Sequence, residues 1–149
     1  MAALCIPADD RIRAVEEIIS YKFTDPSVLH EALQAAGFIL PDGNKNLALV
    51  GDAALKLILV LDGHGRGASR GKINNIISTK ASNAHLADQG FLRGLDKYVY
   101  TNPSQGSFVS DGVMATTMQA ILGAIFLESS QDISVLQNVV AVLGLSWPE

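Results

Sequence analysis

Apolar residues recur at helical spacing along most of the chain, and no segment alternates apolar and polar residues long enough to predict a strand. The pattern predicts six helices, over residues 9–20, 25–36, 44–62, 69–89, 114–126 and 132–143. A polar segment over residues 101–112 is expected to form a loop before the fifth helix. The expected fold class is all-α.

Residues that commonly cap or stop helices mark several of these ends. Asp25 is expected to cap the second helix, with Pro26 at the first helical position and Gly37 as the stop. Ser69 is expected to cap a long fourth helix that continues to Gln89, where Gly90 would break it. The residues of this fourth helix expected to face inward are Ile73, Ile76, Ile77, Ala84 and Ala87.

The third helix differs from the others because its apolar residues point around the whole circumference. Such a helix must be covered on every side, and its own core can cover only one flank. We therefore expect a partner subunit on the other flank, as in a homodimer. No membrane span is expected, because Gly51, Asp52 and Lys56 interrupt the apolar stretch and it falls short of the about 20 residues that a span requires.

Length and composition are those of a single domain over residues 1–149. Apolar residues make up 48% and charged residues 17%, which leaves more apolar surface than a lone domain of this size can hide and favours an oligomer. The net charge of −4 argues against strong binding of double-stranded RNA. Cys5 is the only cysteine, and no secretory or transit pattern is found at the N-terminus, so an intracellular, cytoplasmic location is expected.

Three segments carry a resemblance to a known family. Residues 44–53, NKNLALVGDA, resemble the ribonuclease III signature, which reads NERLEFLGDA. Residues 82–87 are similar to the SN-x-x-LA motif of that family, and residues 115–126 are similar to its ADxxEALIGAIY helix. The register is consistent over residues 21–128. The resemblance implies a dimeric, all-α ribonuclease III-type domain, and no double-stranded RNA-binding domain is expected beside it.

The resemblance also implies where the chemistry of the family would be carried. Its members cleave double-stranded RNA with water activated by Mg²⁺, which carboxylates on two facing helices hold. Spacings of three and four place these carboxylates on one face of each helix. Where the family pattern has Glu, Glu, Asp, Asp and Glu, this chain has Lys45, Ala48, Asp52, Thr116 and Gln119. Only Asp52 could still bind a metal ion, and the Lys45 ammonium would repel one, so a pseudoenzyme without a cofactor is expected.

Asp52 lies within an apolar helix, where an unpaired charge is costly, so we expect another group to satisfy it. Lys45, two turns earlier on the same face, is a candidate ion-pair partner. The structural interpretation of Asp52 is a hydrogen-bonding carboxylate. The functional interpretation is a relic metal ligand, or an acid or base in new chemistry.

A glycine-rich connection over residues 63–67 contains a second candidate site. Arg66, followed by Arg70 and Lys72, could present positive charge and backbone amides to the phosphates of RNA, and the alternative interpretation is a solvated loop. A zinc site is not expected, because His30, His64 and His85 lack metal-ligand spacing.

Three functions remain open from the sequence. The favoured one is a catalytically inactive dimer that acts as a scaffold or assembly partner, paired with itself or with an active family member, and has at most weak contact with RNA. The first alternative is an active double-stranded RNA endonuclease with an atypical metal site, which alone would require Mg²⁺. The second is an enzyme of different chemistry between the subunits, using a set such as Lys45, Asp52, Gln119 and His64.

Overall fold

The computed structural model describes residues 6–148. Its helices are α1 (Ala8–Ile19), α2 (Pro26–Ala32), α3 (Lys45–Gly65), α4 (Arg70–Lys80), α5 (Asn83–Leu92), α6 (Asp111–Glu128) and α7 (Ile133–Val142), with 3₁₀ turns η2 (Leu95–Tyr98) and η3 (Pro103–Gln105). The expected all-α fold class is confirmed. Cys5 lies outside the described residues.

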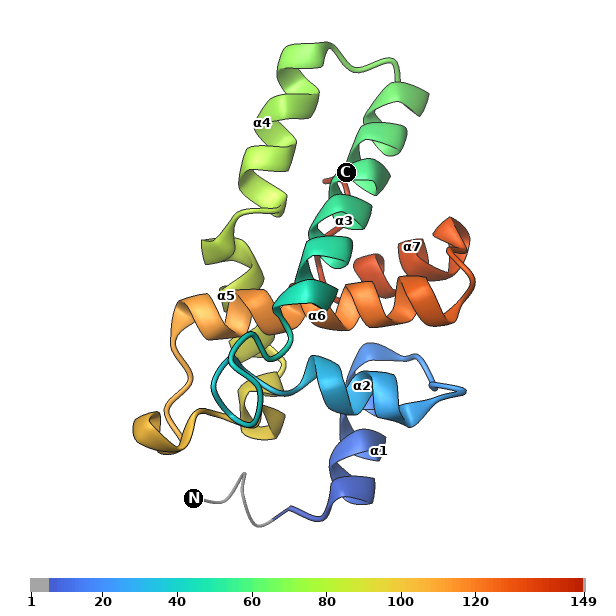
Figure 1. Cartoon of the computed structure of the whole chain (residues 1–149). Helices are drawn as coiled ribbons and strands as arrows, with labels where there is room; N and C mark the ends of the chain where they lie inside the picture. Colours follow the sequence, from blue (N-terminus) through green and yellow to red (C-terminus); the bar gives the residue numbers. More distant parts are fainter. Residues whose placement is uncertain (1–5, 149) are drawn as a thin grey trace.

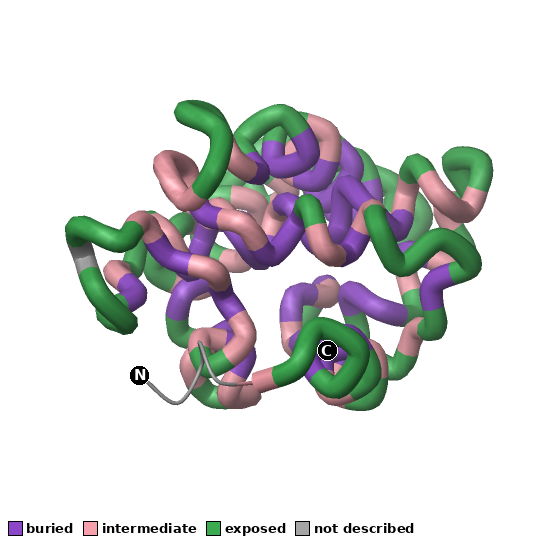
Figure 2. The backbone as a smooth tube through the Cα atoms, turned by 60° about the horizontal axis from the view of Figure 1, so that its bottom comes forward, coloured by how far each residue is buried: buried purple, intermediate pink, exposed green. Residues whose placement is uncertain are grey.

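Helix α6 lies at the centre of the fold, and α3 crosses it (Figure 1). Helices α2, α5 and α7 also pack against α6, and α4 runs beside the second half of α3. Nearly every residue of α6 from Met114 to Ile125 is buried. Figure 2 shows the buried segments grouped in the interior, with exposed segments at the periphery. The core is therefore built around one helix that is buried along most of its length.

The expected helix starts at Asp25 and Ser69 are confirmed. The Asp25 carboxylate accepts a hydrogen bond of 3.1 Å from the Ser27 amide, and Pro26 is the first residue of α2. The Ser69 hydroxyl accepts one of 3.1 Å from the Lys72 amide at the start of α4. Each cap satisfies an amide that the helix itself cannot, which is why these starts can be read from local sequence.

The end of α2 was predicted wrongly. The helix stops at Ala32 instead of continuing to residue 36 and Gly37. The chain after it pairs with a distant segment: the Ala35 amide donates to the Tyr100 carbonyl and the Tyr100 amide donates to the Leu33 carbonyl, each at 2.8 Å. These two bonds take backbone groups that a longer helix would need.

The long helix predicted over residues 69–89 is two helices, α4 and α5. Ser82 separates them, because its hydroxyl accepts from the His85 amide to start α5 and donates to the Thr79 carbonyl at the end of α4. Gly90 does not break α5 but lies within it, packed against Met114. Ala84 is exposed, contrary to the expectation that it faces inward.

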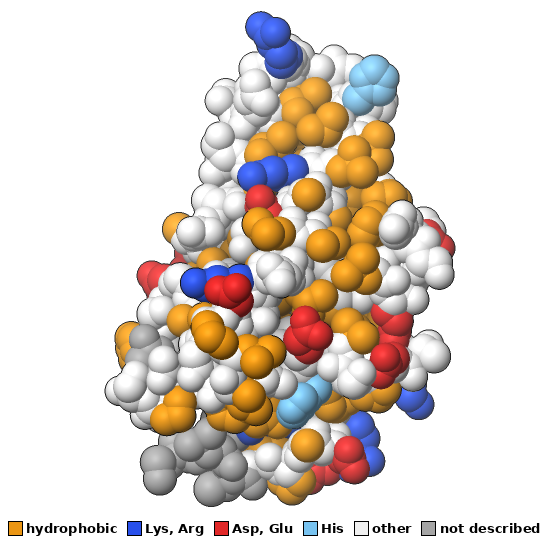
Figure 3. Space-filling model, viewed as in Figure 1, with side chains coloured by type: hydrophobic (Ala, Val, Ile, Leu, Met, Phe, Trp, Pro, Cys, Tyr) orange, Lys and Arg blue, Asp and Glu red, His pale blue; other side chains and the backbone are white. Residues whose placement is uncertain are grey.

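One flank of α3 is buried and the other is exposed. Leu47, Leu55, Ile58 and Leu59 lie in the core. The outer face of α3 comprises Leu49, Leu57, Val60 and Leu61, whose exposed fractions range from 40% to 72%. Figure 3 shows hydrophobic side chains grouped over the region of α3. No helix within residues 6–148 combines the length and apolar character needed to cross a membrane.

Candidate functional site

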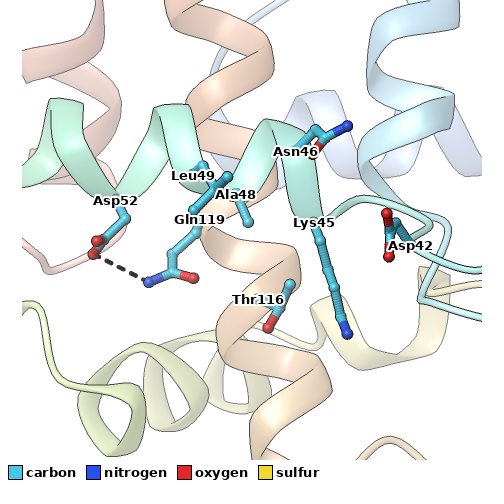
Figure 4. A pocket seen from close by; sticks show the side chains of 8 residues that line it. All are labelled: Asp42, Lys45, Asn46, Ala48, Leu49, Asp52, Thr116 and Gln119. Atoms are coloured by element: carbon cyan, nitrogen blue, oxygen red, sulfur yellow. Dashed lines mark hydrogen bonds between the residues drawn. The ribbon is translucent and has the colours of Figure 1, made fainter.

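A hollow of about 450 Å³ lies where α3 crosses α6 (Figure 4). At this crossing two glycines allow the backbones to approach closely: a Cβ at Gly51 would overlap the Gln119 carbonyl oxygen, and one at Gly123 would overlap that of Leu47. The residues that line this α3–α6 hollow are Asp42, Lys45, Asn46, Ala48, Leu49, Asp52, Thr116 and Gln119. The fold thus brings together all five positions that the resemblance singles out.

Both oxygens of the Asp52 carboxylate have partners within the protein. Oδ2 forms an ion pair of 3.0 Å with the Lys56 ammonium, one turn later on α3. Oδ1 accepts a hydrogen bond of 3.2 Å from the Gln119 amide on α6. The Asp52 side chain retains 32% of its exposure, so this is a surface arrangement rather than a buried charge. Asp52 on α3 therefore contacts α6 through its hydrogen bond with Gln119.

The expected ion pair between Lys45 and Asp52 is wrong. Lys45 is the first residue of α3 and is exposed, and Figure 4 shows it extending away from Asp52. Two turns of helix separate their Cα atoms by roughly 10 Å along the axis, whereas residues four apart are neighbours. The spacing of four residues between Asp52 and Lys56 indicates in the sequence that Lys56 is the ion-pair partner of Asp52.

The donor groups of the α3–α6 hollow do not fit a Mg²⁺ ion. Mg²⁺ requires hard oxygen ligands with enough negative charge to compete with its hydration shell. Of the two carboxylates in the lining, Asp52 is already paired with an ammonium, and Asp42 comes from the loop before α3. Ala48 offers a methyl group, and Lys45 adds positive charge. Within residues 6–148, no three acidic, histidine or cysteine side chains are grouped as a metal ion would require.

The basic residues predicted to contact phosphate lie at the other end of α3. Arg66 follows the last turn of α3, and its guanidinium lies 5.9 Å from the centre of the Trp147 ring. Arg70 and Lys72 are exposed on the first turn of α4. The fold does not bring these three residues to the α3–α6 hollow (Figure 1).

His64 does not belong with Lys45, Asp52 and Gln119, contrary to the set proposed for different chemistry. It lies in the last turn of α3, twelve residues after Asp52. That spacing corresponds to about 18 Å along the helix axis. Lys45, Asp52 and Gln119 do line one hollow, and Asp42, which the sequence analysis did not single out, lines it with them.

No protein-family model matches the chain. It is 29% identical over 144 residues to ribonuclease 3 of Vibrio atlanticus and 27% identical over 145 residues to that of Oleidesulfovibrio alaskensis, with 91% of the chain covered in each case. The nuclease domain of ribonuclease III from Campylobacter jejuni superposes with a TM-score of 0.79 at 21% identity, covering 89% of this chain and 94% of that domain. The chain has the fold of a ribonuclease III nuclease domain and is similar in sequence to ribonuclease 3 proteins.

The chain spans 60% of the length of the Vibrio relative and 63% of that of the Oleidesulfovibrio relative. A second structure of the Campylobacter nuclease domain gives a TM-score of 0.77 at 20% identity. The helical fold of these nuclease domains is thus present, while the side chains where α3 crosses α6 differ from the carboxylate pattern quoted above.

Proposed function

We propose that this ribonuclease III-type domain is a catalytically inactive, dimer-forming assembly partner. The observation that carries the proposal is the engagement of Asp52 by Lys56 and Gln119. A metal ion would have to displace both groups and overcome the repulsion of two nearby ammonium groups, because Lys45 lines the same hollow. Without a bound metal ion, no water would be activated for hydrolysis of RNA, and the domain needs no Mg²⁺.

The outer face of α3 supports the dimer. A soluble protein rarely leaves several leucine and valine side chains of one helix exposed unless a partner covers them. The nuclease domain of ribonuclease III from Campylobacter jejuni has a region involved in dimer formation. In this chain the partner is a second copy or an active member of the same family.

Contact with RNA is a minor part of the proposal. Arg66, Arg70 and Lys72 lie near one another in sequence at the turn between α3 and α4, where they could touch phosphate groups. The chain as a whole carries 15 acidic against 11 basic residues, which weakens attraction to double-stranded RNA. The single cysteine agrees with a reducing, intracellular setting. Assembly within an RNA-processing complex fits these properties better than tight RNA binding.

The decisive experiment is cleavage of a labelled RNA duplex with Mg²⁺ and with Mn²⁺, with the oligomeric mass measured in the same buffer. The proteins compared are the wild type, Asp52→Asn, and Asp88→Asn as a matched control on the exposed surface of α5. The proposal expects no cleavage by any of the three and a dimeric mass for all. Metal-dependent cleavage that Asp52→Asn abolishes and Asp88→Asn retains would identify an active endonuclease instead.

A further inference from the structure

Helix α4 differs from the other helices because none of its residues 70–80, all of which the structure describes, is buried. It packs against α3 and α5, with Ile73, Ile76 and Ile77 half-buried. Most of its residues have low helix propensity: one glycine, two asparagines, three isoleucines, one serine and one threonine. A helix with weak propensity and no buried residue belongs to the low-stability part of a fold, where local opening occurs.

Both ends of α4 allow it to move as a unit. Gly67, three residues before α4, is exposed and has a φ of +70°, and no atom lies within 4 Å of where its Cβ would be. Ser82 ends the helical pattern on the other side and separates α4 from α5. The second half of α3 and α4 together extend beyond the other helices at one end of the molecule (Figure 1). Rotation at Gly67 and near Ser82 would swing α4 away without unwinding α3 or α5.

The C-terminal tail, residues 143–148, connects the body of the protein to these two helices. Its start is held on α5 by two hydrogen bonds. The Arg93 guanidinium donates to the Val142 carbonyl at 2.8 Å, and the His85 Nε2 donates to the Gly144 carbonyl at 3.1 Å. Leu145 is fully buried. The start of the tail is therefore anchored independently of α4.

The end of the tail brings Trp147 to the contact between α3 and α4. A Cβ at Gly63 of α3 would lie 2.6 Å from the Trp147 ring and 2.6 Å from the Ile73 side chain of α4, so both side chains converge on this glycine. The Trp147 side chain is only 6% exposed, and the Arg66 guanidinium lies 5.9 Å from its ring centre. A large buried ring from the tail thus fills the contact between two helices that do not themselves supply it.

We infer that α4 is a flap that opens from α3 as a unit, and that Trp147 is the latch that keeps it closed. Opening exposes the Trp147 ring and the half-buried isoleucines of α4, while the start of the tail stays on α5 and the core around α6 stays folded. Arg70 and Lys72 lie on the first turn of α4, so they move with the flap. The inference depends neither on the dimer nor on the loss of nuclease activity, so its test can fail while the proposed function stands.

The test is amide hydrogen exchange followed by nuclear magnetic resonance under native conditions, where each rate reports the opening that exposes the amide. In the wild type, amides of α4 should exchange faster than those of α6, which are exposed only by global unfolding. Trp147→Ala destabilises the closed state but not the open one. It should therefore speed exchange in α4 by at least about tenfold, which is ~1.4 kcal/mol.

Val15→Ala is the matched control. It shortens a fully buried side chain of α1, at the opposite end of the molecule from α4 (Figure 1), so it destabilises the closed and open states alike. It should speed exchange in α6 and leave α4 at the wild-type rate. A merely structural role of Trp147 would not produce this difference, because α4 would then exchange through global unfolding and both variants would speed it.

Trp147→Phe keeps an aromatic ring at the same place and should speed exchange in α4 less than Trp147→Ala does. Circular dichroism establishes that each variant is folded, and Trp147→Phe decides the matter if Trp147→Ala does not fold. Equal exchange rates for α4 and α6 in the wild type overturn the inference. So does an unchanged rate in α4 when Trp147 is replaced, and so does a faster rate in α4 of Val15→Ala.

Discussion

Gly51 of α3 and Gly123 of α6 face each other at the point where the two helices cross. A Cβ atom on either residue would overlap the backbone of the opposite helix. This contact sets the distance between the helices and therefore lets the Gln119 amide on α6 reach Asp52, the residue next to Gly51. The glycine pair thus determines both the packing of the core and the geometry of the candidate site.

Gly51→Ala should lower the free energy of unfolding by about 3 kcal/mol or more, since the added methyl group meets backbone that cannot move aside. Denaturant unfolding of both proteins measures this difference. Gly71→Ala is the matched control: it lies in α4 with no atom within 4 Å of its added Cβ, and should stabilise the protein by roughly 0.5 kcal/mol through helix propensity. Equal effects of the two substitutions would contradict the close approach of α3 and α6.

Restoring the four missing carboxylates should create a Mg²⁺ site, because the helical frame already groups these positions around one hollow. The variant combines Lys45→Glu, Ala48→Glu, Thr116→Asp and Gln119→Glu. Its melting temperature should rise with Mg²⁺, by the equivalent of about 2.7 kcal/mol at a concentration one hundred times the dissociation constant. The wild type should show no such rise, and adding Asp52→Asn to the variant should reduce it. A Mg²⁺-dependent rise in the wild type would count against the proposed inactivity.

Leu57→Glu should weaken the proposed dimer by at least about tenfold, because it places a charge in the apolar outer face of α3. Sedimentation equilibrium measures the change in the dimer dissociation constant. Leu92→Glu is the control, since Leu92 is 75% exposed but lies on α5, outside that face. A monomeric wild type, or a dimer that Leu57→Glu leaves intact, would show that the outer face of α3 is not the interface.

The stability of the protein at alkaline pH should depend on the hydrogen bond between Tyr21 and Glu128. The Tyr21 hydroxyl donates to the Glu128 carboxylate at 2.5 Å, and burial, assisted by that bond and by the negative charge, raises the pKa of Tyr21 from 10.0 to about 12. A raised folded-state pKa means that this stabilisation is present below pH 10 and is lost as the pH rises through about 12. In Tyr21→Phe, the free energy of unfolding should no longer show the part of its decline at alkaline pH that comes from this hydrogen bond.

Urea unfolding at a series of pH values between 10 and about 12 measures how the free energy of unfolding depends on this hydrogen bond. Tyr98→Phe is the matched control, because Tyr98 makes no side-chain hydrogen bond to another described residue, and it should keep the wild-type pH profile. Identical profiles for Tyr21→Phe and the wild type would show that the Tyr21–Glu128 bond does not contribute to stability in this window.

Several features of the fold were predictable because their causes are local. Asp25 and Ser69 cap helices through bonds to amides two and three residues away, so the sequence around them contains the whole interaction. The end of α2 was not predictable in the same way, since the partner of Ala35 is Tyr100, far along the chain. The division at Ser82 is local, but a serine within a helical pattern is compatible with either a cap or a continuous helix.

The candidate site shows the same distinction. The spacing of Lys45, Ala48 and Asp52 placed them on one face of α3, and the resemblance directed attention to Thr116 and Gln119 on α6. Lys45 is not the partner of Asp52, because residues four apart on a helix are neighbours and Lys56 therefore lies closer to Asp52 than Lys45 does. His64 lies outside the site because the length of α3 places it at the opposite end of that helix.

The sequence by itself determined the all-α class, most helix starts, the apolar circumference of α3 and the absence of a carboxylate at four of the five positions that the resemblance singles out, because periodicity, capping and residue identity are properties of short segments. The tertiary structure alone decided which flank of α3 is exposed and that Asp52 is shared between Lys56 and Gln119. These features depend on how closely α3 and α6 approach, and that distance follows from packing between residues far apart in the chain.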